Sequence, residues 1–161
     1  GHDTTNTTMS GSLWALAQHP AEWARLKADP ALLSTAIDEM LRWVSPVNTF
    51  MRTATRDYEL RGKTIRAGES VLLPFASANR DEDVFAEPFT FKVDRKPNPH
   101  IAFGFGAHAC LGQHLAKMEL RAFFREFLAR VESFEVVTEP TINAIPTAYQ
   151  IRNLPIRYRM N

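Results

Sequence analysis

Residues 103–112 contain the side chains with the clearest chemical potential. They read Phe-Gly-Phe-Gly-Ala-His-Ala-Cys-Leu-Gly and include Cys110, the one cysteine among 161 residues. Gly104, Gly106 and Gly112 permit backbone conformations and close approaches that a side chain would block. Apolar residues follow at helical spacing, so we expect a helix that runs to about residue 131. A thiol at the start of such a helix meets unpaired N–H groups and the positive end of the helix dipole. Both favour the thiolate, the form that ligates metals.

The sequence leaves three interpretations of Cys110 open. A lone cysteine is often a buried structural residue. Together with His108 or His114 it could form a Cys/His zinc site, although one thiol with loosely spaced histidines is a poor ligand pattern. It could instead ligate a haem iron as thiolate, with glycines that let backbone N–H groups reach the sulfur and an aromatic loop that faces the porphyrin.

The stretch resembles the haem-binding signature of the cytochrome P450 family, Phe-Gly-x-Gly-x-His/Arg-x-Cys-x-Gly, and matches it at every specified position. We therefore favour the haem interpretation. The resemblance implies haem b (iron protoporphyrin IX), with Cys110 as the axial ligand of the iron. Arg52 and His108 would bind the haem propionates, and Phe103 would limit water access to the sulfur. The full set of residues that the resemblance places against the cofactor is Arg52, His100, Phe103, Gly104, His108, Cys110, Leu111 and Gly112.

The elements that must position these residues are expected to be mainly helices. Apolar residues repeat at helical spacing near the N-terminus, after Pro20 and from residue 32 to residue 43. Pro20 fits a first helical turn, and Pro30 and Pro46 mark the ends of the segments before them. The long helix that follows Cys110 completes the set.

Strand patterns occupy part of the remaining sequence. Residues 47–52 and 56–60 read as extended, and residues 70–75 read as a buried strand, with glycine turns between them. Phe85, Phe89 and Phe91 are expected in the core. The predicted fold class is therefore mainly α with a small antiparallel β portion. By resemblance it is the C-terminal part of the cytochrome P450 fold.

Composition limits the class of protein. A formal charge of +1 and 45% hydrophobic residues describe one globular unit that is neither disordered nor strongly basic, so we expect no nucleic-acid partner. No apolar run approaches the ~20 residues that span a bilayer, so we expect no membrane insertion. A single cysteine suits a reducing compartment, and we expect a cytoplasmic location. Residues 1–161 are expected to be the C-terminal haem-binding portion of one domain, a truncated piece of a longer chain.

Glu39 and Arg42 lie at i and i+3 on one helix face, where they can pair. Such pairs are usually exposed and contribute little to stability. Glu39-Met40-Leu41-Arg42 resembles the Glu-x-x-Arg motif of the family, however, and residues 91–95 resemble the loop that supplies a second arginine. The resemblance implies a buried structural cluster of Glu39, Arg42 and Arg95.

Asp3 and Thr4 have two interpretations. An Asp-Thr pair commonly caps a helix N-terminus. Gly1-His2-Asp3-Thr4-Thr5 also resembles the oxygen-activation motif of the family. On that resemblance Thr4 and Asp3 are catalytic: Thr4 would hydrogen-bond the oxygen being activated, and Asp3 would gate the delivery of protons to it.

Two further sets of residues follow from the resemblance. Lys117, Arg121 and Arg125 form a basic stripe where the family docks its electron donor, although such a stripe is usually a solvated helix face. We expect Lys117 and Arg121 to steer an acidic ferredoxin, itself reduced by an NAD(P)H-dependent reductase. The residues that would line the substrate pocket are Val47, Asn48, Thr49, Thr147 and Ala148, for each of which plain strand or turn is the alternative.

The function implied by the resemblance is that of a haem-thiolate monooxygenase, which inserts one atom of O₂ into a small hydrophobic substrate. Phe-Met-Arg-Thr-Ala, Ser-Ala-Asn-Arg-Asp and Cys-Leu-Gly-Gln-His-Leu-Ala-Lys are similar to soluble bacterial members that hydroxylate monoterpenes such as terpineol. A terpene-like or alkyl-aromatic substrate is therefore expected. The alternatives are a truncated haem-binding fragment without turnover and a zinc-binding interaction module.

Overall fold

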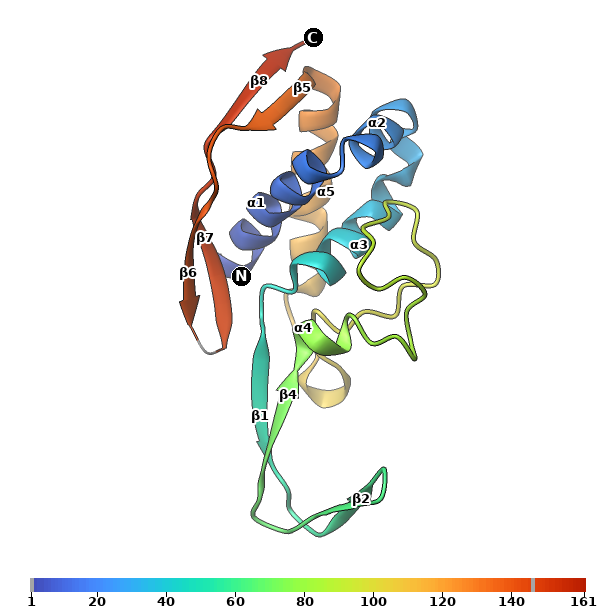
Figure 1. The fold of residues 1–161 in the computed structure, drawn as a ribbon, viewed down its shortest axis with the longest axis vertical. Coiled ribbons are helices and arrows are strands. Elements are labelled where there is room, and N and C mark those ends of the chain that lie inside the picture. The colour runs from blue at the N-terminus through green and yellow to red at the C-terminus, as the bar shows by residue number, and fades with distance from the viewer. Residues whose placement is uncertain (1, 146) are drawn as a thin grey trace.

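The computed structural model describes residues 2–145 and 147–161. In this part of the chain, helices form the body of the molecule and pairs of antiparallel strands lie at its side and below it (Figure 1). The helices are α1 (Asp3–Gln18), α2 (Pro20–Ala28), the 3₁₀ turn η1 (Pro30–Leu32), α3 (Leu33–Val44), α4 (Phe75–Ala78), the 3₁₀ turn η2 (Gly106–His108) and α5 (Gln113–Arg130).

The helix boundaries have local causes. Pro20 occupies the first position of α2, where its missing N–H costs nothing. The Asp29 side chain accepts a hydrogen bond from the Ala31 backbone N–H (3.0 Å) and so starts η1. Ser45 takes a left-handed conformation (φ 44°) directly before Pro46 and ends α3. At the far end of α5, the Lys27 ammonium group donates to two backbone carbonyl oxygens and satisfies part of the helix C-terminus.

The core lies where α1, α3 and α5 cross. Leu16 from α1, Met40 from α3 and Leu120 and Phe124 from α5 are fully buried there. Phe91, from the irregular segment between α4 and η2, closes the core from the side. A helical body with small antiparallel sheets is the fold class that the sequence predicts, and the prediction is confirmed.

The strands form four antiparallel pairs within the described residues. β1 and β4 make a ribbon that extends away from the helices, and β2 lies at its far end (Figure 1). The other pairs flank α1 and α5. The bounds are β1 (Thr49–Thr53) with β4 (Ser70–Pro74), β2 (Tyr58–Leu60) with β3 (Lys63–Ile65), β5 (Val131–Val136) with β8 (Ile156–Met160), and β6 (Thr141–Ile145) with β7 (Ala148–Asn153).

Two expectations about burial are wrong. The strand at residues 70–75 is not buried: Leu72 is 55% exposed, because the ribbon that contains it projects beyond the helical body. Phe85 and Phe91 are in the core as expected, but Phe89 is 66% exposed. Among residues 2–145 and 147–161, no helix is both long and apolar enough to span a membrane.

Candidate haem site

The loop around Cys110 is closed by its own backbone. The Cys110 N–H donates to the Phe103 carbonyl oxygen (2.8 Å), and the Gly104 N–H donates to the Ile101 carbonyl oxygen (2.8 Å). Gly104 and Gly106 have φ values of 73° and 67°, which other residues adopt only at a cost. These turns bring Cys110 back beside Phe103 before α5 begins, and they leave the thiol exposed.

A cavity of about 620 Å³ lies between this loop, α1, β1 and β4. That volume is typical of small-molecule and cofactor pockets, which range over about 300–1,000 Å³. Most of its lining is aliphatic or aromatic. The lining residues are Thr4, Thr5, Thr8, Leu41, Pro46, Val47, Phe50, Arg52, Leu73, Pro74, Phe75, Ala78, Ile101, Ala102, Phe103, Gly104, Phe105, His108, Cys110, Gly112, Ala116 and Leu120.

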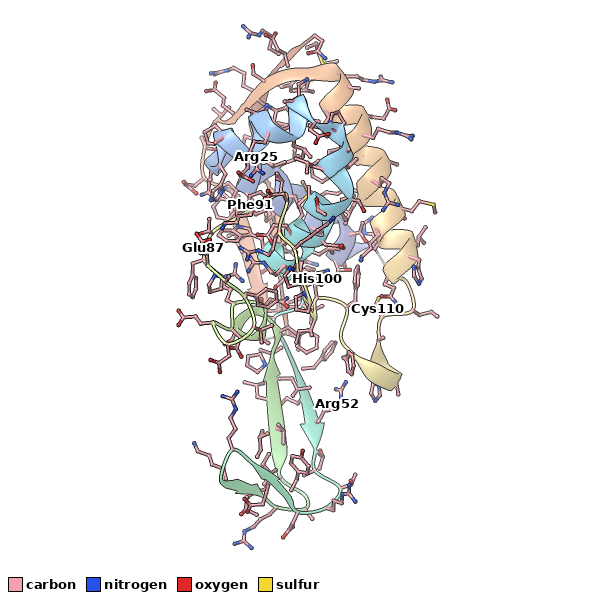
Figure 2. The ribbon with its side chains drawn as sticks, turned by 90° about the vertical axis from the view of Figure 1, so that its right-hand side faces the viewer. Arg25, Arg52, Glu87, Phe91, His100 and Cys110 are labelled. Atoms are coloured by element: carbon pink, nitrogen blue, oxygen red, sulfur yellow. The ribbon has the colours of Figure 1, made fainter. Side chains whose placement is uncertain are left out.

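Six of the eight residues expected at a cofactor line this cavity: Arg52, Phe103, Gly104, His108, Cys110 and Gly112. Arg52 comes from β1 and Cys110 from the loop, and both lie on the same side of the molecule (Figure 2). The other two residues do not line it. Leu111 is fully exposed. The His100 side chain is only 7% exposed and faces Asp38 on α3, with Nε2 3.7 Å from the carboxylate.

The residues present fit a haem. Cys110 offers one thiolate, and Arg52 and His108 offer hydrogen-bond donors for two carboxylates. A side chain at Gly112 would place its Cβ 3.9 Å from the Cys110 sulfur, so glycine keeps the space beside the sulfur open. The remaining wall is apolar, as a porphyrin face requires.

A buried ionic cluster holds the segment that leads to this loop. Arg42 forms a bidentate pair with Glu39 (2.7 and 2.8 Å), and Arg95 donates to the same carboxylate at 2.9 Å. The Lys92 backbone N–H and the Asn98 side chain complete the coordination of Glu39. The side chains of Glu39 and Arg42 are fully buried, and that of Arg95 is nearly so.

The two guanidinium groups bind backbone as well as Glu39. Arg42 donates to the carbonyl oxygens of Asn79 and Pro88, and Arg95 to those of Ala86 and Thr90. These bonds fasten residues 79–95, which have little regular structure of their own, to α3.

Asn79 links α3 to the cysteine loop and was not singled out as a site residue by the sequence analysis. Its buried amide donates to the Ser45 hydroxyl (2.8 Å) at the end of α3 and accepts from the Ile101 backbone N–H (2.8 Å). The Ser45 hydroxyl in turn donates to the Arg42 carbonyl oxygen (2.7 Å). One side chain therefore sets the spacing between the helix end and the start of the loop.

We expect Asn79→Ala to lower the free energy of unfolding by about 2 kcal/mol, because an unsatisfied buried donor or acceptor costs ~1–3 kcal/mol. Chemical denaturation measures the change. Ser77→Ala, at an exposed position on α4, is the matched control and should change stability by less than ~0.5 kcal/mol. Equal effects of the two substitutions would contradict the bridging role.

The two residues of the predicted catalytic pair, Asp3 and Thr4, lie in different surroundings. Thr4 lines the cavity, whereas Asp3 lies at the exposed start of α1 beside His2 (3.2 Å). Neither side chain caps the helix, whose N-cap position is His2. The sequence analysis missed Thr8, which also lines the cavity and donates its hydroxyl to the Thr4 carbonyl oxygen (2.7 Å). A repeat of threonines every fourth residue is the signal that could have indicated it.

The two predicted substrate segments lie together. Val47 forms an antiparallel bridge with Ala148, and the Asn48 N–H donates to the Thr147 carbonyl oxygen (2.9 Å). The Thr49 backbone N–H also donates to the Thr147 carbonyl oxygen (3.4 Å). Of the five residues, Val47 lines the cavity.

The basic stripe on α5 is not uniform. Lys117 is paired with Asp38 on α3 at 2.7 Å, and its side chain is 32% exposed. Arg121 and Arg125 lie further along the helix and are exposed. Burial acts to raise the pKa of Asp38, but its interactions with His100 and Lys117 outweigh burial and hold that pKa below its ordinary value of 3.8.

Stability should therefore depend on pH through Asp38. A lowered folded-state pKa means that the unfolded chain takes up this proton first. The contribution of Asp38 is thus complete above about pH 4 and is lost as the pH falls through the folded pKa. We expect Asp38→Asn to destabilise the chain at pH 6 and to be less destabilising at pH 2.

Urea unfolding of both proteins at each pH measures this difference. Asp83→Asn is the control, because Asp83 and its partner Arg61 are 3.5 Å apart and both exposed, so that their pair contributes little. A stability gap between the native chain and Asp38→Asn that stays constant from pH 6 to pH 2 would contradict the assignment.

Within residues 2–145 and 147–161, no three or more His, Cys, Asp or Glu side chains lie close enough together to hold a metal ion between them. The described residues therefore supply no ligand set for the zinc module. A haem iron needs a single protein ligand, which Cys110 can provide.

A single thiol on a glycine-rich loop faces an apolar cavity that has an arginine and a histidine at its wall, an arrangement that fits a haem-thiolate site. The family model that matches the chain is Cytochrome P450, over residues 28–158. The chain belongs to the cytochrome P450 family, whose cofactor is haem b.

Individual proteins similar to this chain carry names from the same family or from its class of activity. Cytochrome P450-terp of Pseudomonas sp. is 46% identical over 158 residues, which cover 98% of this chain and 37% of that protein. Steroid C26-monooxygenase of Mycolicibacterium smegmatis is 44% identical over 149 residues, which cover 92% of this chain and 37% of that protein. The structure of cytochrome P450-153 from Novosphingobium aromaticivorans superposes with a TM-score of 0.94 at 38% identity. The match covers 99% of this chain and 40% of that one. The chain thus spans less than half the length of these relatives.

Proposed function

We propose that this chain is the haem-binding part of a monooxygenase that inserts one atom of O₂ into a small hydrophobic substrate. The observation that carries the proposal is the position of Cys110, which lies on a loop closed by glycine turns and lines an apolar cavity together with Arg52 and His108. Membership of a family whose named relatives include monooxygenases supports it.

Several residues that line the cavity would hold the haem, each at a different part of the cofactor. The Cys110 thiolate ligates the iron, and the Arg52 and His108 side chains bind the propionates. Phe103, which lines the cavity together with Cys110, would limit the access of water to the sulfur once haem is bound. The bound haem supplies the activation of dioxygen and the oxidation of the substrate.

The residues of α1 handle protons. Thr4 lines the cavity, and its hydroxyl can both donate and accept a hydrogen bond, so it can hold a proton at Oγ1. Asp3, one residue earlier, is exposed to solvent outside the cavity lining, so protons that it delivers to Thr4 would travel through water.

The substrate we propose is terpene-like or alkyl-aromatic. The cavity wall offers Val47, Phe50, Leu73 and Phe75, which suit an apolar molecule with few polar groups. Asn48, Thr49, Thr147 and Ala148 form the strand contacts that hold Val47 in place. The name of one relative, cytochrome P450-terp, fits this class of substrate.

The electron donor we propose is a ferredoxin with an NAD(P)H-dependent reductase. Arg121 and Arg125 are exposed on α5, which begins three residues after Cys110, so an acidic partner docked there would approach the haem from the side of the sulfur. Lys117 adds positive charge to the same face, although Asp38 offsets part of it.

Thr4→Ala tests the proton-handling role. We expect the haem-loaded protein to keep its absorbance spectrum but to divert reducing equivalents from product to hydrogen peroxide, because the hydroxyl that holds the proton is lost. Product and peroxide formed per NAD(P)H measure the split. Thr4→Ser retains the hydroxyl and serves as the control. Fully coupled turnover in Thr4→Ala would contradict the role.

The second candidate function is haem binding without turnover. It is favoured by the position of Asp3, whose side chain is 72% exposed and lies outside the cavity lining. This function predicts a thiolate-type spectrum with no product from any electron donor, and detection of hydroxylated product in the Thr4 experiment would exclude it.

A further inference from the structure

Three ionisable side chains from separate segments lie close together near Phe103, at the start of the cysteine loop. Asp38 comes from α3, Lys117 from α5 and His100 from the segment just before the loop. The Lys117 ammonium lies 2.7 Å from the Asp38 carboxylate, and His100 Nε2 lies 3.7 Å from the same oxygen. None of the three lines the haem cavity.

A hydrogen bond to the His100 ring indicates the tautomer of its neutral form. Its Nδ1 accepts the backbone N–H of Ala102 (3.3 Å), so that nitrogen carries no proton. The proton of the neutral ring is then on Nε2, the atom that faces Asp38. The ring is nearly buried in this orientation, so it holds the backbone at Ala102 in a defined position.

The same side chains contact Phe103. The Lys117 ammonium lies 5.9 Å from the centre of the Phe103 ring, and the His100 and Phe103 rings are 6.2 Å apart. The Phe103 carbonyl oxygen accepts the Cys110 N–H (2.8 Å), and Phe103 and Cys110 both line the cavity. A continuous set of contacts therefore runs from the surface of α5 to the cysteine.

We propose that Asp38, Lys117 and His100 form a positioning unit for Phe103 and the Cys110 loop, and that the charges of Asp38 and Lys117 offset each other's effect on the reduction potential of the haem at Cys110. The part that concerns the potential rests on the proposed function. Lys117 is then a positioning residue whose charge acts on the sulfur side of the site, and not chiefly a free cation for donor docking.

Opposite charges in the unit predict effects of opposite sign. Reduction adds one negative charge at the haem, which a nearby positive charge favours and a nearby negative charge opposes. Asp38→Asn leaves the Lys117 charge unbalanced and should raise the potential. Lys117→Gln leaves the Asp38 charge unbalanced and should lower it. The double variant should return close to the native value.

Potentiometric titration of the haem-loaded chain provides the test. We expect each single variant to change the equilibrium constant for reduction by about threefold, a shift of ~28 mV at about 59 mV per tenfold change for one electron. Lys117→Arg keeps the positive charge, so its reduction potential should equal that of the native chain. Arg121→Gln removes an exposed charge one turn further along α5 and is the matched control. Shifts of the same sign in both single variants, or shifts no larger than that of the control, would overturn the proposal.

A haem-free measurement separates this inference from the proposed function. If the chain shows no thiolate-type haem spectrum, the proposed function fails, and amide hydrogen exchange then decides the positioning role. Asp38→Asn and Lys117→Gln should speed exchange at the Ala102 and Cys110 amides by more than tenfold, and Arg121→Gln should not. Unchanged exchange at both amides in both variants would overturn the proposal.

Discussion

Replacing Glu39 with glutamine should destabilise the chain by about 3–5 kcal/mol. The glutamine has the same shape, but the Arg42 and Arg95 guanidinium groups lose the carboxylate that both contact within 2.9 Å. Removing one partner of a buried ion pair costs ~3–5 kcal/mol, because the remaining charge stays buried without compensation. A domain of this size is typically stable by ~5–15 kcal/mol, so this loss is a large fraction of the total.

Urea unfolding followed by circular dichroism measures the loss at Glu39. Glu135→Gln is the matched control, because Glu135 pairs with Arg157 at 2.7 Å on the exposed face of β5 and β8. Exposed pairs contribute ~0–1 kcal/mol. If Glu39→Gln is no more destabilising than Glu135→Gln, the cluster does not hold residues 79–95 against α3 in the way described.

Replacing Cys110 with serine should abolish thiolate ligation while leaving the fold intact. The Cys110 side chain is exposed, so a hydroxyl in its place costs little packing. A serine hydroxyl does not ionise near neutral pH and cannot replace the thiolate as an iron ligand. The loss of haem affinity should exceed the ~10–100-fold that follows from removing an outer-shell partner of a metal ligand.

Equilibrium haem titration and the ferric absorbance spectrum measure this loss. Unfolding of the haem-free variant should match that of the native chain, which separates ligation from folding. Ala109→Ser, which adds a hydroxyl next to the cysteine at an exposed position, is the control and should retain affinity. Native affinity and a native spectrum in Cys110→Ser would remove Cys110 from the site.

Local sequence predicts the helices well, because their boundaries depend on neighbouring residues. Pro20 starts α2, Ser45-Pro46 ends α3, and the apolar repeat after Cys110 gives α5 its length. The glycines of the cysteine loop were also informative, since Gly104 and Gly106 occupy left-handed conformations. The pair Glu39 and Arg42 was identifiable from its spacing on one helix face.

Contacts between distant segments were not predictable in the same way. The pairing of Asp38 with Lys117, 79 positions apart in sequence, depends on how α3 and α5 cross, and periodicity carries no information about that. The Asn79 bridge likewise joins the end of α3 to the start of the cysteine loop. Leu72 is an apolar residue whose exposure follows from the direction in which the β1–β4 ribbon leaves the helical body, and Phe89 is exposed although its segment is fastened to α3.

The reduced, CO-bound absorbance spectrum of the haem-loaded chain tests the central claim most directly. If Cys110 ligates the iron as thiolate within the cavity that Arg52, Phe103 and His108 line, the main absorbance band should be strongly shifted to the red. A band at the ordinary position for a haem without thiolate would contradict the assignment of Cys110 as the iron ligand.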